Sequence, residues 1–381
     1  MNSAATGRLG RDGPDFRIPV LRPKLPDPKD MLPYLERIHR NSIASNGGPL
    51  SRELEARLAE LFGPSCGVAS CCSATLGLTI SLLAQRAESG TLCMVPAWTF
   101  AASAHAIVAA GLVPWIVDVD RKTRRLEPAA ALDLLERAPG RIGAVIPVSE
   151  FGLPVDSEGW DVFQDRTGLA VVLDLAAAFD GTRPARVPSV ISLHATKTVT
   201  AGEGGFILST DDDLIEAIRQ CANFGFSKSN HATGPALNAK LSEYAAAVAL
   251  ASLSDWPDNR KALQAVGQQY RDVLQGIGCV RLPDGWPAEW VSSTFNVRLE
   301  ADILPAVVRN LESIGVASRS WWGPGLHRQE AFAKFERTET PITDNLAATT
   351  LGLPFWIGLP IEAPGAIAQV IANTERDFLS R

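Results

Sequence analysis

The chain has 381 residues, of which 46% are hydrophobic, and it carries a formal net charge of −6. This length and apolar content allow a large core and more than one domain, while a mildly acidic chain without a basic stripe argues against nucleic acid as a partner. Because no apolar run is long enough to span a bilayer, no signal-peptide core is visible, and the six cysteines lack C-x-x-C spacing, we expect a cytoplasmic protein with free thiols, no membrane partner and no metal site.

The N-terminal part of the chain changes from polar to helical. Residues 1–16 are rich in Gly, Asp and Arg and are predicted to be disordered. Residues 18–26 form an extended arm punctuated by proline, and residues 30–40 have helical periodicity. Ser51 is then predicted to cap a helix that carries Leu54, Leu58 and Leu61 on one face.

Strand-like and helix-like segments alternate through the middle of the chain. Strands are predicted at 66–70, 92–95, 113–119, 144–148, 170–173, 190–193 and 206–209, and helices follow at 73–78, 101–110 and 211–223. Alternation of this kind predicts an α/β fold with a mostly parallel central sheet and right-handed crossovers.

The pattern changes at Trp256-Pro257, where we expect a break. A linking helix at 260–277 should lead into a smaller α+β unit, with strands at 293–299 and 316–320 and helices at 303–314 and 364–379. The predicted division is a large domain at 17–256, and a linker helix with a small C-terminal domain at 257–381.

Two polar residues follow buried strands in the large domain. Asp174 ends the apolar run 170–173, and Lys197 follows the strand 190–193 within a segment rich in hydroxyl groups and glycine. Ligands of open α/β sheets gather at the carboxyl ends of the strands. A lysine for an aldehyde and an aspartate for a pyridinium nitrogen are the pair that pyridoxal phosphate needs. A solvated loop lysine and a capping or turn aspartate are the alternatives.

Two further segments can complete such a site. Ser73, Ala74 and Thr75 open a helix, and its N-terminus offers free N–H groups to a phosphate, although simple capping by Ser73 explains the same pattern. Phe100 lies in the turn after a strand, where an aromatic ring can stack on a pyridine face. Packing in the core is the alternative for an aromatic residue there, particularly for Trp98.

Residues 192–205, S-L-H-A-T-K-T-V-T-A-G-E-G-G, resemble the lysine motif of the DegT/DnrJ/EryC1/StrS aminotransferases, and Asp174-Leu175-Ala176 resembles the aspartate motif of the same family. The likeness extends with gaps from about Ser45 to the C-terminal helix. It implies a fold-type I aminotransferase with bound pyridoxal 5'-phosphate. It also implies an amino group moved from L-glutamate to a keto-sugar nucleotide, with a dTDP- or UDP-linked 4-keto-6-deoxyhexose favoured.

The resemblance implies roles for other residues as well. Ala74, Thr75 and Ser192 would contact the cofactor phosphate, and Phe100 would stack on its ring. Residues 234–243 would reach across a homodimer with shared active sites, placing Asn238 at the neighbour's cofactor, with helix capping as the alternative for Asn238. The residues expected on the substrate side are His194, Lys240, Arg319, Trp321 and His327.

Three positions depart from the family pattern. Ala177 replaces a Gln or His that touches the ring hydroxyl of the cofactor, Ser149 replaces a His, and Ala222 replaces an Arg. Loss of one hydrogen bond costs about 1 kcal/mol, so we expect a weakened cofactor site and an active aminotransferase. Two alternatives remain: a sugar dehydratase, disfavoured because such family members carry His at the position of Lys197, and a non-catalytic regulatory or binding protein.

Overall fold

The computed structural model describes residues 17–63, 65–227 and 231–380, so the predicted disorder of residues 1–16 lies outside the described residues. We call the part of the chain before Glu243 the large domain. Its helices are α1 (Pro28–Asn41), α2 (Pro49–Phe62), α3 (Ala74–Ala84), α4 (Ala101–Ala109), α5 (Pro128–Leu135), α6 (Ser157–Thr167) and α7 (Asp212–Ala222). Its strands are β1 (Gly67–Cys71), β2 (Leu92–Pro96), β3 (Val113–Val117), β4 (Ile142–Val145), β5 (Ala170–Val171), β6 (Leu173–Asp174), β7 (Ser189–Ser192) and β8 (Gly205–Ser209). The helix α8 (Glu243–Leu274) leads to β9 (Phe295–Arg298), α9 (Leu304–Ser313), two 3-10 turns (Leu326–Arg328 and Glu330–Phe332), α10 (Pro341–Thr349), β10 (Thr350–Leu353) and α11 (Ala363–Leu379).

The large domain is built on a mostly parallel sheet, as predicted. One group of strands has the order β3-β2-β4-β5 and is parallel throughout, and a second has the order β1-β8-β7-β6, in which β8 is antiparallel to both neighbours. Only Val172 separates β5 from β6, and a bridge joins Val148 to Asp174, so the two groups adjoin. The carboxyl ends of β2, β4, β6 and β7 therefore lie along one edge.

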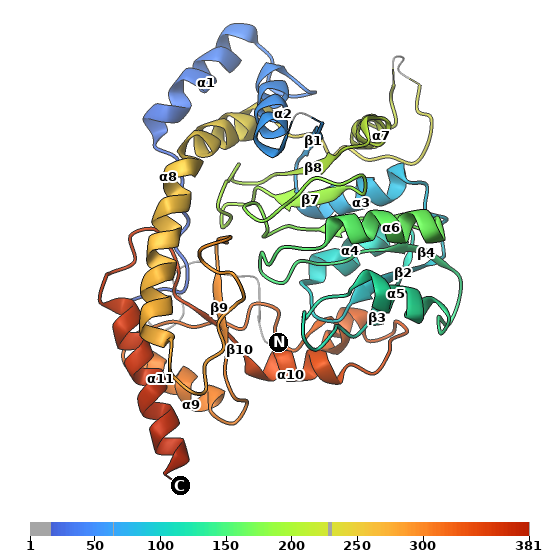
Figure 1. Cartoon of the computed structure of the whole chain (residues 1–381). Helices are drawn as coiled ribbons and strands as arrows, with labels where there is room; N and C mark the ends of the chain where they lie inside the picture. Colours follow the sequence, from blue (N-terminus) through green and yellow to red (C-terminus); the bar gives the residue numbers. More distant parts are fainter. Residues whose placement is uncertain (1–16, 64, 228–230, 381) are drawn as a thin grey trace.

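Both faces of this sheet are buried. Val190 and Ile207 belong to one hydrophobic cluster, and their neighbours Ile191 and Phe206 belong to another. Successive side chains of a strand point to opposite faces, so the alternation places a hydrophobic layer on each side. Helices supply the other half of both layers: α3 packs on α4 and α7, and α5 packs on α6 (Figure 1).

The break predicted at Trp256-Pro257 is wrong, because α8 runs without interruption through both residues. The first half of α8 packs against α1 and α2 (Figure 1). The helix α8 also contacts α11. Pro257 removes one backbone hydrogen bond, but its ring is exposed and does not have to be accommodated in the core. Burial of Trp256 and Leu263 on the other face holds the helix together.

The small unit differs from the prediction at one strand. β9 pairs with β10 in an antiparallel ribbon, but the predicted strand at 316–320 makes only single bridges, from Val316 to Ile18 and from Arg319 to Gly352. The N-terminal arm is extended, as predicted, and it supplies the missing partner: Ile18 exchanges backbone hydrogen bonds with Gly315 and Ala317. A segment from the start of the chain thus completes the C-terminal unit.

The cap predicted at Ser51 is also wrong. α2 begins at Pro49 after Gly48, and Ser51 lies inside the first turn. The buried carboxylate of Glu243 accepts hydrogen bonds from the N–H groups of Leu50 and Ser51 and from the Ser51 hydroxyl, each at 2.8 Å. Glu243, 192 positions from Ser51, therefore accepts the hydrogen bonds at the N-terminus of α2 that a local capping side chain was expected to accept.

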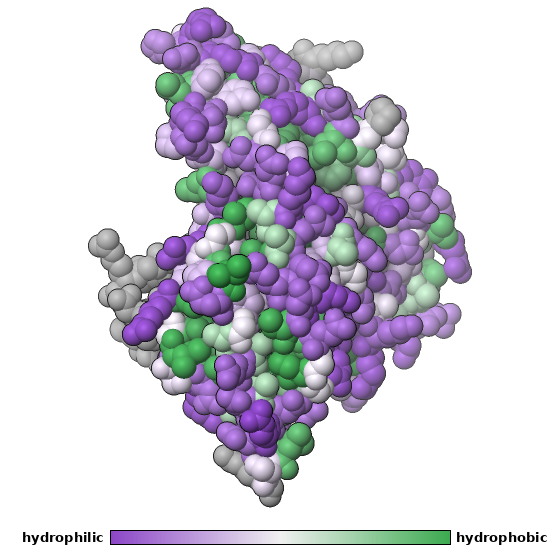
Figure 2. All heavy atoms as spheres, turned by 60° about the vertical axis from the view of Figure 1, so that its left-hand side comes forward, coloured by the Kyte–Doolittle hydropathy of each residue, from purple (hydrophilic) through white to green (hydrophobic). Residues whose placement is uncertain are grey.

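On the side where α8 and α11 lie, the surface is mainly hydrophilic with small hydrophobic patches (Figure 2). All six cysteines are free thiols. Within the described ranges, no helix combines the length and the apolar character needed to cross a membrane.

Candidate active site

Lys197 lies in a compact loop that joins β7 to β8. The loop is closed by backbone hydrogen bonds from Ala195 to Gly202 (2.7 Å) and from Ala201 to Leu193 (2.7 Å), and Gly202 adopts a φ of +80°, a conformation that favours glycine. The half-buried Lys197 side chain makes no hydrogen bond or ion pair with any residue that the structure describes. Burial lowers the pKa of Lys197, and the charge of Asp174 opposes this shift.

Asp174 ends β6 as a buried carboxylate. Its Oδ2 accepts a hydrogen bond from Ser103 Oγ at 2.7 Å, and its Oδ1 accepts one from the Ala176 N–H at 3.2 Å. Burial raises the pKa of Asp174, whereas these hydrogen bonds and Lys197 oppose that rise. The bond to Ala176 makes Asp174 a turn residue, as the alternative proposed, and the carboxylate is also close enough to Lys197 for their charges to interact.

Ser103 was not anticipated from the sequence. Its hydroxyl lies 2.8 Å from Thr99 Oγ1 and 2.7 Å from Asp174 Oδ2, so α4 fixes the orientation of the carboxylate. The signal available in the sequence is the spacing of Thr99 and Ser103, four residues apart at the start of a helix that follows a strand.

The N-terminus of α3 can accept an anion. Ser73 caps the helix, because its Oγ accepts from the Leu76 N–H at 3.2 Å, so the capping interpretation is correct. The N–H groups of Ala74 and Thr75 have no acceptor within the described part of the chain, which leaves them for a phosphate. A Cβ atom on Gly205 would lie 2.8 Å from the Ala74 nitrogen, so glycine is what lets β8 pass so close to this helix end.

Ser192 belongs to the same corner of the sheet. It is the last residue of β7 and pairs with Gly205, and its Oγ accepts a hydrogen bond from the His194 N–H at 3.2 Å. The His194 ring lies 2.8 Å from Thr196 Oγ1 and 3.6 Å from a carboxylate oxygen of Glu203. Ser192 pairs with Gly205, and Gly205 lies against Ala74. The end of β7, the start of β8 and the N-terminus of α3 therefore meet at the candidate phosphate site.

A pocket with about 330 Å³ of empty space opens beside Lys197. Its lining includes Arg22 and Lys24 from the N-terminal arm, and Arg22 lies over the ring of Trp356 at 4.8 Å from the ring centre. These two cations were not anticipated, because the arm is far from Lys197 in the sequence. They make the mouth of the pocket positively charged.

Asn238, expected to reach a neighbouring subunit, and Phe100, expected to stack on the cofactor ring, both lie at the surface of the chain. Asn238 is exposed, and Ser242 rather than Asn238 caps α8, so the capping alternative for Asn238 is excluded. Lys240 Nζ lies 4.4 Å from the centre of the Phe224 ring. Phe100 precedes α4 and its side chain is 59% exposed, whereas Trp98 is buried as a core aromatic.

The residues expected on the substrate side are not all brought to Lys197. His327 is buried and its Nε2 lies 2.9 Å from Asp344 Oδ1, a contact that joins the 3-10 turn Leu326–Arg328 to α10. Arg319 is exposed over the Trp321 ring, and neither of these two residues lines the pocket at Lys197.

Of the three departures from the family pattern, Ser149 has a structural account, and for the other two the structure shows only the surroundings. The buried Ser149 hydroxyl donates to the Leu153 carbonyl at 2.8 Å, which closes the turn after β4. The Ala177 carbonyl accepts from Ser292 Oγ at 3.1 Å, so the backbone of Ala177 contacts the C-terminal unit while its side chain is a methyl group. Ala222 is buried at the end of α7, and nothing in the structure explains its identity.

The groups present fit pyridoxal phosphate: an unpartnered lysine amine, a buried carboxylate, and two free N–H groups at a helix N-terminus. The fold and the site define a pyridoxal-phosphate-dependent aminotransferase of fold type I. A sequence model of the DegT/DnrJ/EryC1/StrS aminotransferase family matches residues 27–373, and the chain belongs to that family.

Individual relatives agree with this assignment. The chain is 32% identical over 340 residues to a UDP-N-acetyl-3-dehydro-alpha-D-glucosamine 3-aminotransferase of Acidithiobacillus ferrooxidans, covering 86% of this chain and 89% of that protein. It is 31% identical to a dTDP-4-amino-4,6-dideoxy-D-glucose transaminase of Shigella dysenteriae, covering 94% and 98%. The crystal structure of DesI in the presence of its TDP-sugar product is similar with a TM-score of 0.84 and 30% identity, covering 96% of this chain and 95% of that one.

Proposed function

We propose that this enzyme transfers the amino group of L-glutamate to a keto-sugar carried on a nucleotide, with a dTDP- or UDP-linked 4-keto-6-deoxyhexose as the favoured acceptor. The observation that carries the proposal is the Lys197 amine beside a pocket whose mouth holds Arg22 and Lys24. Two cations at that position suit the diphosphate of a nucleotide sugar. Support also comes from relatives that are named for UDP- and dTDP-linked sugars.

Each residue of the site has a defined task in this proposal. Lys197 would hold the cofactor through its aldehyde group, and the Lys197 amine would move a proton between carbon atoms of the substrate. Asp174, oriented by Ser103, would keep a proton on the ring nitrogen. The N–H groups of Ala74 and Thr75 would hold the phosphate together with Ser192. Pyridoxal phosphate supplies the electron sink that stabilises a carbanion.

The proposal includes a homodimer with shared active sites. Phe100 and Phe224 are 59% and 47% exposed, and Asn238 lies at the surface close to both the Phe224 turn and the end of β1. A second subunit that covers this region would bury the aromatic rings and bring its Asn238 to the neighbour's cofactor phosphate.

The test of the reaction is a substrate screen. The purified protein is incubated with L-glutamate and either 3-keto or 4-keto sugars linked to dTDP or UDP, and the products are identified by mass spectrometry. Formation of an amino-sugar nucleotide from one acceptor supports the proposal, and L-glutamate should be converted to 2-oxoglutarate in equal amount. Removal of water from the sugar without amination would identify a dehydratase.

The cofactor assignment has its own test. Protein with bound pyridoxal phosphate should absorb visible light and lose that band on borohydride reduction, and peptide mapping should find the reduced adduct on Lys197. An adduct on another lysine would show that Lys197 has been misassigned. Absence of any band in protein supplied with the cofactor would favour the non-catalytic alternative.

A further inference from the structure

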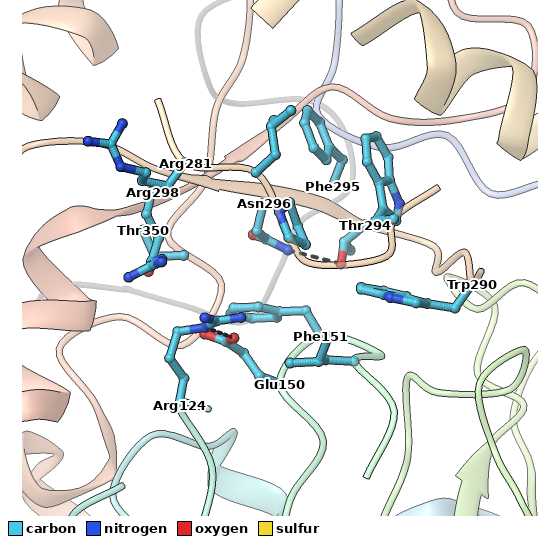
Figure 3. A pocket seen from close by; sticks show the side chains of 14 residues that line it. Arg124, Glu150, Phe151, Arg281, Trp290, Thr294, Phe295, Asn296, Arg298 and Thr350 are labelled. Carbon is cyan, nitrogen blue, oxygen red and sulfur yellow. Dashed lines mark hydrogen bonds and ion pairs between the residues drawn. The ribbon is translucent and has the colours of Figure 1, made fainter. Parts of the chain in front are cut away.

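A second pocket lies between the large domain and the C-terminal unit. It holds about 470 Å³ of empty space, including its open mouth, and shares no lining residue with the pocket at Lys197. Figure 3 shows Thr294 and Asn296 on one side of it and Glu150, Phe151 and Arg124 on the other. The remaining lining residues are Leu153, Arg281, Leu282, Pro283, Trp286, Trp290, Phe295, Arg298 and Thr350.

The wall contributed by β9 is polar although it faces the interior. Thr294, Asn296 and Arg298 alternate with Phe295 and Val297, so the three polar residues share one face of the strand. A polar face of a strand normally meets water. Here it is turned toward the large domain, and Asn296 is only 9% exposed.

Several polar atoms of the residues that line the pocket are buried without a partner. Asn296 donates from Nδ2 to Thr294 Oγ1 at 3.2 Å, but Asn296 Oδ1, Thr350 Oγ1 and Trp286 Nε1 have no hydrogen-bond partner within the described ranges. Thr350 pairs with Arg298 across β9 and β10 and is 5% exposed. Each buried polar atom left unpaired costs about 1–3 kcal/mol, so unpaired atoms gathered in one pocket indicate a ligand that pairs with them.

The cations of the pocket are not equivalent. Arg124 pairs with Glu150, with Nε and Oε2 2.6 Å apart, and both side chains are buried. Arg281 is exposed and donates to the Gly278 carbonyl. Arg298 is half-buried and makes no side-chain hydrogen bond or ion pair with the described residues, and burial together with the nearby Arg124 lowers its pKa. An unpaired guanidinium group beside a second arginine is a site for an anion.

We propose that this interdomain pocket binds a small metabolite that carries a carboxylate or phosphate group and, on the same molecule, a hydroxyl or ammonium group. Arg298 pairs with the anionic group, Asn296 Oδ1 accepts a hydrogen bond from the hydroxyl or ammonium group, and Thr350 contributes its hydroxyl. Trp290 and Phe151 supply apolar walls. The site goes beyond the proposed amino transfer, because it is separate from Lys197.

A hydrogen bond links the pocket to the turn between β2 and α4, which carries Trp98 and Thr99. Glu150 Oε1 accepts a hydrogen bond from Trp98 Nε1 at 2.8 Å, and Trp98 immediately precedes Thr99, which contacts Ser103. A ligand that contacts Glu150 and Arg124 would therefore contact a chain of buried residues that runs through Trp98, Thr99 and Ser103 to Asp174.

The proposal is tested by isothermal titration calorimetry of the full chain with L-malate, sn-glycerol 3-phosphate and inorganic phosphate. We expect one of the two organic probes to bind, and Arg298→Met to raise its Kd about tenfold or more, as expected for a lost hydrogen bond to a charged group. Arg281→Met is the matched control at the mouth of the pocket, and the Kd should not change. L-malate binding identifies a carboxylate site, and glycerol 3-phosphate binding identifies a phosphate site.

Two further variants keep the test decisive. Asn296→Asp preserves the size of the side chain and places a carboxylate two residues from Arg298, so probe binding should be lost while the melting temperature is kept. Lys197→Ala should leave probe binding unchanged. The proposal is overturned if neither organic probe binds, if Arg298→Met binds as well as the unmodified protein, or if Lys197→Ala abolishes binding, since the probe would then lie in the active site.

Discussion

Ser103 is a positioning residue whose effect passes through Asp174. Ser103→Ala removes the hydrogen bond that opposes the raised pKa of Asp174, so the carboxylate should hold the cofactor ring less well. A hydrogen bond to a charged group contributes about 1.5–3 kcal/mol, and we expect the Kd for pyridoxal phosphate to rise about tenfold or more. Absorbance titration of the apoprotein measures this change.

The control for Ser103 is another buried serine. Ser81→Ala removes a hydroxyl that donates only to the Gly77 carbonyl within α3, and it should leave the Kd for pyridoxal phosphate unchanged. Ser103→Thr, which restores a hydroxyl, should recover part of the affinity. Equal losses in the Ser81 and Ser103 variants would mean that Ser103 acts through packing alone.

Lys197 should take up the cofactor in a pH range below that of an ordinary lysine. Burial lowers its pKa from 10.5, and only the neutral amine attacks an aldehyde, so uptake should increase as pH rises through this lowered pKa. Because the charge of Asp174 raises the pKa of Lys197, Asp174→Asn should move the rise in uptake to lower pH. Stopped-flow absorbance at saturating pyridoxal phosphate gives the profile, and a move to higher pH contradicts the proposed interaction.

The positions of candidate site residues could be predicted where they depend on the local sequence. They could not be predicted where they depend on contacts between distant segments. Lys197 and Asp174 each follow a short buried strand, and the parallel sheet then brings the strand ends together. Ser103 reaches Asp174 over 71 positions of the sequence, and Arg22 of the N-terminal arm lines the same pocket as Lys197. The alternation of Thr294, Asn296 and Arg298 alone predicts a strand face that is exposed to water. The sequence does not show that the large domain covers this face.

At the scale of elements, Glu243 joins the N-terminus of α2 to the first turn of α8. Glu243→Gln removes the charge and replaces one acceptor oxygen by an amide donor that faces N–H groups. We expect the free energy of unfolding to fall by about 2–3 kcal/mol, measured by urea denaturation. Glu53→Gln is the control, because the partly exposed pair of Glu53 with Arg37 should contribute under about 1 kcal/mol.

Most elements begin and end close to their predicted bounds, since hydrophobic periodicity follows burial. The failures have a common cause: a local signal was overruled by packing from a distant segment. Ser51 is a good capping residue, but Glu243 already satisfies the end of α2. Pro257 is a helix breaker, but α8 is held by contacts with α1, α2 and α11. The segment 316–320 is apolar at its start, but its neighbour is the N-terminal arm, which supplies a single bridge.

At the scale of the whole molecule, the proposed sharing of active sites in a homodimer predicts complementation between subunits. Lys197→Ala and Asn238→Ala should each reduce activity, but in a mixed dimer one site would carry both lesions and the other none. Co-expressed and separately tagged subunits should therefore recover activity above either parent. If Asn238 serves its own subunit, each site keeps one lesion, and no recovery is expected.

A continuous α8 also limits where this chain can exchange segments with its relatives. A helix of 32 residues is about 48 Å long, and this one acts as a strut that belongs to both halves of the chain. Recombination between relatives at Trp256 would join two unmatched half-helices and disturb the packing on either side. Crossovers beyond Leu274 keep the strut from one parent, so natural and laboratory chimaeras that retain folding should have their junctions there.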